Sequence, residues 1–201
     1  MVLHNSFRIP LDCEVFYYPQ FMSPTEATTL FSYLLSTLDL SDYTVPLATG
    51  REYRMNVAKS MFIDTTNDEL RKLSEFHGRK MDWPKPLREV KETIQDLTGD
   101  IFDVCVCIYY KDGTRGVGFH SDLYAFGDIS VIPSLSLGAE REFTLRKACN
   151  HNEQFTLKLA SGSLIVMGEG CQEEYEHALL SDETVADPRI NLTFRKFGYE
   201  W

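Results

Sequence analysis

The segment GVGFHSDLYAFGD, residues 116–128, places a histidine two residues before an aspartate. Alternate strand residues point the same way, so on a strand the side chains of His120 and Asp122 would aim at one point. Imidazole and carboxylate are two of the three ligands in the facial triad that holds non-haem ferrous iron and leaves coordination positions open. An HxD pair also arises often by chance. Taken alone, such a pair more often consists of two polar side chains on a solvent-exposed strand face.

A third metal ligand would have to come from a distant part of the chain. His177, in CQEEYEHALL, follows the apolar segment GSLIVMG, and we expect it near the edge of a sheet. His151, in ACNHNEQ, is expected to lie in a solvated polar loop. His177 is therefore the candidate for the third ligand.

Two arginines occur together in the segment DPRINLTFRKF, residues 187–197. Alternation puts the apolar residues 190, 192 and 194 on one face of the expected strand. The polar face carries Arg189, Asn191, Thr193 and Arg195. Such a face could be solvated, or it could clamp a dicarboxylate, because guanidinium binds carboxylate by paired, charge-assisted hydrogen bonds. A ferrous site beside a dicarboxylate clamp describes an oxygenase that uses 2-oxoglutarate.

Helices are expected in the first half of the chain. In residues 23–38, Ser23 and Glu26 have the spacing of a capping box, and Pro24 suits the first helical position. An apolar stripe follows at helical spacing. A second helix is predicted within residues 85–100, with Gly99 as its stop signal.

From residue 101 onward the apolar residues alternate with a period of two, which is typical of short strands separated by turns. The expected strands lie in DVCVCIYY, IPSLSLG, REFTLRK, QFTLKL, GSLIVMG and RINLTFRKF. This pattern predicts an α+β protein in which helices brace a sandwich or double-sheet jelly roll. At 201 residues, without repeats or low-complexity linkers, the chain reads as one domain.

Charge, cysteines and hydropathy limit the partners. The net charge is −10 and no run of Lys or Arg is present, so binding to nucleic acid would need a basic patch assembled by folding. No apolar run approaches membrane-spanning length, and residues 1–18 lack the pattern of a signal peptide. Cys105 and Cys107 share a strand face and are expected to be buried, reduced thiols. We therefore expect an intracellular monomer, cytoplasmic or nuclear, that does not bind membranes.

The order and spacing of these motifs resemble the AlkB family of Fe(II)/2-oxoglutarate dioxygenases. The HxD at 120–122, His177 and RINLTFR at 189–195 carry the resemblance, together with YKDGTRGVGFHSD and SLSLGAEREFTLR. The similarity covers roughly residues 104–197. It implies a double-stranded β-helix, a jelly-roll-like barrel, with the metal in its mouth. Residues 1–100 would then be a helical and substrate-lid part, and residues 101–201 the jelly-roll core.

The resemblance also implies the cofactors and the residues that bind them. The cofactors are Fe(II), the co-substrate 2-oxoglutarate and dioxygen. The residues that match iron ligands are His120, Asp122 and His177, and those that match 2-oxoglutarate ligands are Tyr110, Arg189, Asn191 and Arg195. Oxidation of 2-oxoglutarate to succinate and carbon dioxide would accompany hydroxylation of a C–H bond, and a hydroxylated N-methyl group would break down to formaldehyde.

Three departures from the family pattern concern the pocket. Ile108 stands where the family usually has an asparagine two residues before the cofactor tyrosine. Leu123 and Tyr124 stand where base-repair members carry an acid that pairs with a base amino group. Residues 51–68 lack the aromatic-Gly-Asp segment of the substrate lid. Phe62, Tyr124 and Phe126 could stack on a flipped base.

Three hypotheses about function follow. The first is a dioxygenase that oxidatively demethylates an N-alkylated nucleobase. The second is an oxygenase of the same family that acts on a small molecule or a protein side chain and not on nucleic acid, which the acidic charge and the apolar replacements favour. The third is a binding module without catalysis, against which the complete triad and the arginines argue.

Overall fold

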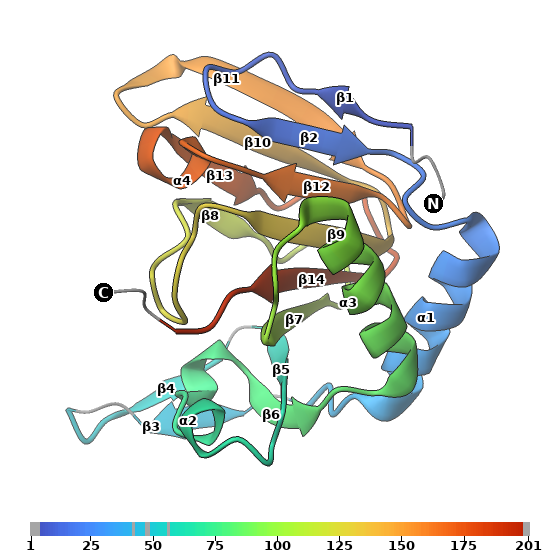
Figure 1. Ribbon diagram of the computed structural model, residues 1–201, viewed down its shortest axis with the longest axis vertical. Helices are drawn as coiled ribbons and strands as arrows, with labels where there is room; N and C mark the ends of the chain where they lie inside the picture. Colours follow the sequence, from blue (N-terminus) through green and yellow to red (C-terminus); the bar gives the residue numbers. More distant parts are fainter. Residues whose placement is uncertain (1–4, 42, 47–48, 56, 199–201) are drawn as a thin grey trace.

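The computed structural model describes residues 5–41, 43–46, 49–55 and 57–198, so His4 lies outside the described residues. Within them the protein is mostly β-sheet with few helices (Figure 1). The larger sheet has eight strands, in the order β1 (Phe7–Arg8), β2 (Val15–Tyr18), β12 (Leu164–Met167), β9 (Ile132–Gly138), β14 (Arg189–Arg195), β7 (Val104–Tyr110), β5 (Ala58–Ile63) and β6 (Arg79–Asp82).

A second sheet has four strands. Its strands are, in order, β11 (Asn150–Leu159), β10 (Arg141–Lys147), β13 (Tyr175–Leu179) and β8 (Val117–His120). A separate hairpin pairs β3 (Thr44–Pro46) with β4 (Glu52–Arg54). The helices are α1 (Pro24–Thr37), α2 (Asp68–Arg71), α3 (Lys85–Thr98) and α4 (Cys171–Glu174), with a 3₁₀ turn, η1, at Glu75–His77.

Both long helices form where the sequence predicts them. At the start of α1, the Glu26 amide donates to Ser23 Oγ at 3.3 Å, and the Ser23 amide donates to the Glu26 carboxylate at 2.9 Å, which completes a capping box. Helix α3 stops at Gly99, whose φ of +78° lies in the left-handed region that favours glycine.

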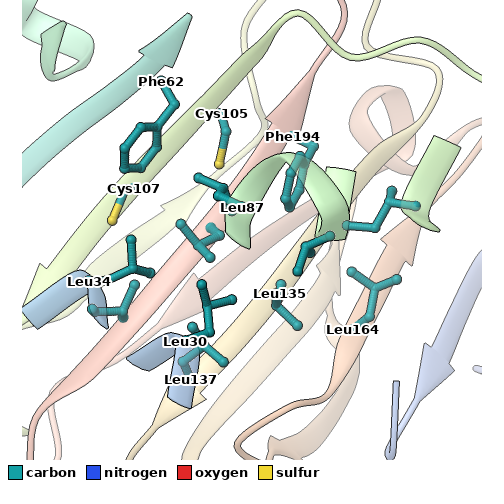
Figure 2. Packing of buried hydrophobic residues seen from close by; sticks show 14 of the residues in the cluster. Leu30, Leu34, Phe62, Leu87, Cys105, Cys107, Leu135, Leu137, Leu164 and Phe194 are labelled. Atoms are coloured by element: carbon teal, nitrogen blue, oxygen red, sulfur yellow. The ribbon is translucent and has the colours of Figure 1, made fainter. Parts of the chain in front are cut away.

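The largest buried cluster joins these helices to the eight-stranded sheet. Leu30 and Leu34 of α1 and Leu87 of α3 lie in it together with Leu135 and Leu137 of β9 (Figure 2). The apolar face of β14 enters the same cluster, and its residues Ile190, Leu192 and Phe194 are fully buried. Because that face is committed to the core, the polar face of β14 has to point the other way, between the sheets.

The thiols of β7 belong to this core. Cys105 and Cys107 are free and buried, as the sequence predicts. Burial raises the pKa of Cys107 to about 12, so its thiol stays protonated and unreactive near neutral pH.

Truncating Leu87 tests how much this packing contributes. Leu87 is fully buried in the main cluster, so Leu87→Ala should lower the free energy of unfolding by about 2–5 kcal/mol through lost burial and a residual cavity. Urea denaturation followed by circular dichroism would measure the loss. A change under about 0.5 kcal/mol, the size expected at an exposed position, would contradict the assigned burial.

Two expectations about the architecture need correction. The described residues among the first hundred form six strands beside the expected helices, so this half of the chain is less helical than expected. Strand β5 pairs with β7 and extends the large sheet, because its residues 60–63 are buried and can fill an interior strand. Within the described residues the strands form separate sheets and no closed barrel.

In the same part of the chain, no helix is long and apolar enough to cross a membrane.

Candidate active site

The four-stranded sheet brings the two histidines of the predicted triad together. His120 ends β8 and His177 lies on β13, where the two residues are direct partners in the antiparallel register. Their ring centroids are 4.4 Å apart, and His177 Nε2 lies 3.9 Å from Asp122 Oδ2. One ligand atom from each of His120, Asp122 and His177 lies within 4.8 Å of the other two. The sequence-predicted triad therefore forms in space.

The way in which the triad forms differs from the expectation. Strand β8 ends at His120, so Asp122 follows the strand and its position does not depend on strand alternation. His177 lies on β13, an inner strand that neighbours the edge strand β8, which agrees with the expected position near a sheet edge. His151 lies on β11 and not in a loop, although it is exposed as expected.

Hydrogen bonds from three elements hold the loop that carries Asp122. Arg195 Nη1 donates to Asp122 Oδ1 at 3.0 Å. The backbone amide of Asp122 donates to Gln172 Oε1 at 2.8 Å, and Ser121 Oγ donates to the carbonyl of Tyr175 at 2.9 Å. A carboxylate outside regular structure is thus fixed by contacts to β14, α4 and β13.

Both imidazoles can offer a lone pair to a metal. His120 Nδ1 lies 2.8 Å from the carbonyl of Gly118, which requires a proton on Nδ1 and leaves Nε2 free to ligate. Burial lowers the pKa of His177 to about 4, so this side chain is neutral near pH 7. Two neutral nitrogens and one carboxylate form the donor set that suits ferrous iron with open positions, and the residues present therefore fit that metal.

The triad opens into a cavity of about 480 Å³ between the two large sheets. The polar face of β14 lines this cavity with Arg189, Asn191, Thr193 and Arg195, as the predicted alternation requires. Ile108 and Tyr110 of β7 lie in the same wall. The two histidines of the predicted triad, from one sheet, thus line the same cavity as arginines from the other.

Arg189 is a buried cation for which the described residues supply no anionic partner. Its side chain is 1% exposed and donates to Ser136 Oγ at 2.7 Å and to two backbone carbonyls at 3.4 and 3.5 Å. None of these partners is charged, and no carboxylate of the described residues forms an ion pair with Arg189. Burial lowers the pKa of Arg189 to about 10, so the guanidinium stays positive near neutral pH. A buried charge is costly unless it is paired, and a carboxylate of a bound dicarboxylate would supply the pairing.

Neighbouring polar groups complete this part of the cavity. Tyr110 faces Arg189 in the strand register and is buried, which raises the pKa of its hydroxyl to about 12 and keeps it protonated as a donor. Asn191 Nδ2 donates to Ser134 Oγ at 2.8 Å. The Arg189 guanidinium and the Tyr110 hydroxyl are thus neighbouring donors in the cavity, which suits an anionic ligand.

The residues expected to stack on a base are only partly placed at the cavity. Phe126 is buried and lines it. Phe62 belongs to the core on the helical side, where its ring lies 6.2 Å from that of Trp83. Tyr124 is 56% exposed and is not part of the cavity wall, whereas Leu123 is. Two of the three aromatic residues were therefore wrongly expected to face a substrate there.

Sequence reasoning missed Lys59, Phe76 and His77, which also line the cavity. Lys59 shares a face of β5 with Met61 and Ile63, which are both fully buried. A lysine that alternates with apolar residues in the sequence was the signal that could have identified Lys59. The turn that places Phe76 and His77 offered no comparable pattern.

A model of the 2OG-Fe(II) oxygenase superfamily matches residues 14–195. Alpha-ketoglutarate-dependent dioxygenase alkB homolog 3 of Homo sapiens is 32% identical to the chain over 122 residues, which cover 56% of this chain and 43% of that protein. DNA oxidative demethylase ALKBH2 of Mus musculus is 34% identical over 122 residues, covering 57% of this chain and 51% of that protein. The chain spans about half the length of the curated relatives it matches.

Similarity to a solved structure supports the fold. The structure of OsALKBH1 superimposes with a TM-score of 0.61 over 94% of this chain and 100% of that chain, at 15% sequence identity.

Proposed function

The chain belongs to the 2OG-Fe(II) oxygenase superfamily, and on this basis we propose that it is an Fe(II)- and 2-oxoglutarate-dependent dioxygenase of AlkB type that oxidatively demethylates an N-alkylated nucleobase. One observation carries the proposal. The His-Asp-His set and the uncompensated guanidinium of Arg189 line one cavity, so a metal and a dicarboxylate would lie side by side in it.

In this proposal the cavity residues form three groups with different roles. His120, Asp122 and His177 hold Fe(II). Arg189 and the hydroxyl of Tyr110 bind the distal carboxylate of 2-oxoglutarate, and Asn191 with Arg195 lies near its keto-acid end. Because Arg195 also donates to Asp122, we assign it a second task, which is to orient that carboxylate toward the metal.

The bound metal and co-substrate supply the oxidation, in which dioxygen converts 2-oxoglutarate to succinate and carbon dioxide and hydroxylates a C–H bond. On an N-methyl group the hydroxylated carbon leaves as formaldehyde, and the nitrogen takes up a proton. The chain's own residues bind both substrates, orient them and exclude water. The names of the relatives, a dioxygenase and a DNA oxidative demethylase, support a nucleobase as the methylated substrate.

Related proposals concern the fold, the oligomeric state and the location of the protein. We propose that the two large sheets correspond to the family's double-stranded β-helix, braced by α1 and α3. We also propose that one copy of the chain is sufficient for activity and that the protein acts inside the cell.

Formaldehyde and succinate release test the proposed function. The protein with Fe(II), 2-oxoglutarate and dioxygen is incubated with a methylated oligonucleotide, with methylated nucleosides or without substrate. We expect formaldehyde from the oligonucleotide well above both controls, and none when 2-oxoglutarate is omitted. A flat response to every oligonucleotide, with succinate still formed, would overturn the nucleobase proposal and favour a small molecule or a protein side chain.

A further inference from the structure

Lys59, Phe76, His77 and Phe126 line a wall of the cavity that the proposed function leaves without a role. Contacts connect this wall to the metal site. Arg195, which donates to Asp122, also lies over the ring of Phe126, with 5.4 Å between its Cζ and the ring centroid. The ring of Phe126 meets that of His77 edge-on at 4.8 Å. A substrate placed at the metal would therefore lie next to this wall.

The wall carries a cation that no described carboxylate neutralises. Lys59 Nζ lies 5.5 Å from the centroid of the Phe76 ring, and the described residues give Lys59 no ion-pair partner. Burial lowers the pKa of this lysine, because removal from water disfavours the charged ammonium. A ligand atom that accepts a hydrogen bond from such a buried donor stabilises it.

His77 adds a neutral group and no negative charge. Burial lowers the pKa of His77, and the positive charges of Lys59 and Arg195 lower it further. The imidazole can therefore take part in a neutral hydrogen bond, and the charges around it already oppose a further cation.

Negative charge is scarce in the whole cavity. Among the described residues that line it, Asp122 is the one acid, and it is already engaged by Arg195 and assigned to the metal. Bound Fe(II) and the 2-oxoglutarate dianion would cancel each other's charge, and Asp122 offsets one of the two arginines. The second arginine and Lys59 then leave the cavity with a positive surplus, which disfavours a cationic ligand.

We propose that Lys59 is a specificity-determining residue that makes the pocket select neutral N-methylated bases presenting a ring carbonyl, such as 3-methyluracil or 1-methylguanine, over the cationic bases 3-methylcytosine and 1-methyladenine. This inference rests on the proposed function. The ammonium group donates to a carbonyl oxygen, whereas the exocyclic amino group of a cationic base presents a second donor and a like charge. Leu123, in the cavity wall, adds no carboxylate that could pair with such an amino group.

The sharpest test compares two bases that differ only at one position of the ring. Single-stranded oligonucleotides of one sequence carry either 3-methyluracil or 3-methylcytosine, which have an oxygen and an amino group, respectively, at position 4. Fluorescence anisotropy measures their Kd for the protein loaded with Fe(II) and 2-oxoglutarate without dioxygen, so that no turnover occurs. We expect the 3-methyluracil oligonucleotide to bind at least about tenfold more tightly. Equal binding, or a preference for 3-methylcytosine, would overturn the inference.

Variants of Lys59 connect this preference to its proposed cause. Lys59→Gln should reduce the ratio of the two Kd values to about threefold or less, and Lys59→Glu should invert it in favour of 3-methylcytosine. Lys111→Gln is the matched control, because it removes the same charge from an exposed position outside the cavity, and it should keep the wild-type ratio. An unchanged ratio in folded Lys59→Glu would refute the role of Lys59.

Binding and turnover separate the inference from the proposed function. A preference for 3-methyluracil in Kd without formaldehyde release would support the pocket's selectivity and defeat the demethylase proposal. Formaldehyde release that is faster from 3-methylcytosine than from 3-methyluracil would support the demethylase proposal and defeat the pocket's selectivity.

Discussion

His120→Ala should abolish 2-oxoglutarate turnover while the protein stays folded. His120 supplies one of three ligands, and its removal leaves two groups that cannot hold ferrous iron in the proposed geometry. Loss of residues that merely support a metal ligand costs about 10–100-fold in affinity or activity, so loss of a ligand should cost at least about 100-fold. Succinate release at saturating Fe(II) would measure the effect.

The structure provides the controls for this experiment. His120 is the last residue of its strand and is only partly buried, so the alanine variant should unfold at a temperature close to that of the wild type. His151→Ala removes an exposed histidine from the neighbouring β11 and should keep full activity and iron content. Wild-type succinate formation by His120→Ala would refute the triad assignment.

Asp122→Ala should abolish turnover too, but it should also destabilise the protein. Arg195 is 5% exposed and would lose Asp122, its carboxylate partner within the described part of the chain. An unpaired buried charge costs about 3–5 kcal/mol, so this variant cannot separate catalysis from folding as cleanly as His120→Ala does.

Arg189→Met should remove 2-oxoglutarate binding with little change in the stability of the ligand-free protein. The guanidinium is buried, and the part of the chain that the structure describes gives it no anion. Its replacement by an apolar side chain of similar length therefore removes a desolvated charge along with its hydrogen bonds to neutral oxygens. At a 2-oxoglutarate concentration of about 100 Kd, the wild-type protein should gain about 2.7 kcal/mol of stability. The variant should gain almost none, because we expect its Kd to rise at least about 100-fold.

Arg141→Met is the matched control for Arg189→Met. Arg141 is also buried, at 2% exposed, and donates to backbone carbonyls, but it lies outside the cavity wall. Two of the hydrogen bonds from Arg141 to carbonyls, at 2.6 and 3.1 Å, are shorter than those from Arg189, at 3.4 and 3.5 Å. Their loss should therefore cost the control about 1–3 kcal/mol of stability, whereas its stabilisation by 2-oxoglutarate should be kept. Thermal unfolding with and without 2-oxoglutarate measures both quantities. Wild-type stabilisation of Arg189→Met by 2-oxoglutarate would contradict the proposed clamp.

Patterns of local spacing predicted the elements of the fold well. The capping box before α1, the glycine after α3 and the period-two segments from residue 101 onward all correspond to observed elements, because each depends on neighbours a few residues apart. The polar face of β14 was predicted for the same reason. The strands of the first hundred residues were missed, because β5 becomes a strand by pairing with β7, a partner more than forty residues away.

The sequence by itself determined the ligand types, their order along the chain and the two faces of the arginine strand. Only the tertiary structure decided that His120 and His177 pair across neighbouring strands, that Asp122 is held by Arg195, and that Phe62 faces the core and not the cavity. It also placed Lys59 in the cavity wall, where no carboxylate of the described residues pairs with it. The physical reason is that alternation assigns a residue to one of two faces, whereas sheet pairing and packing decide what each face meets.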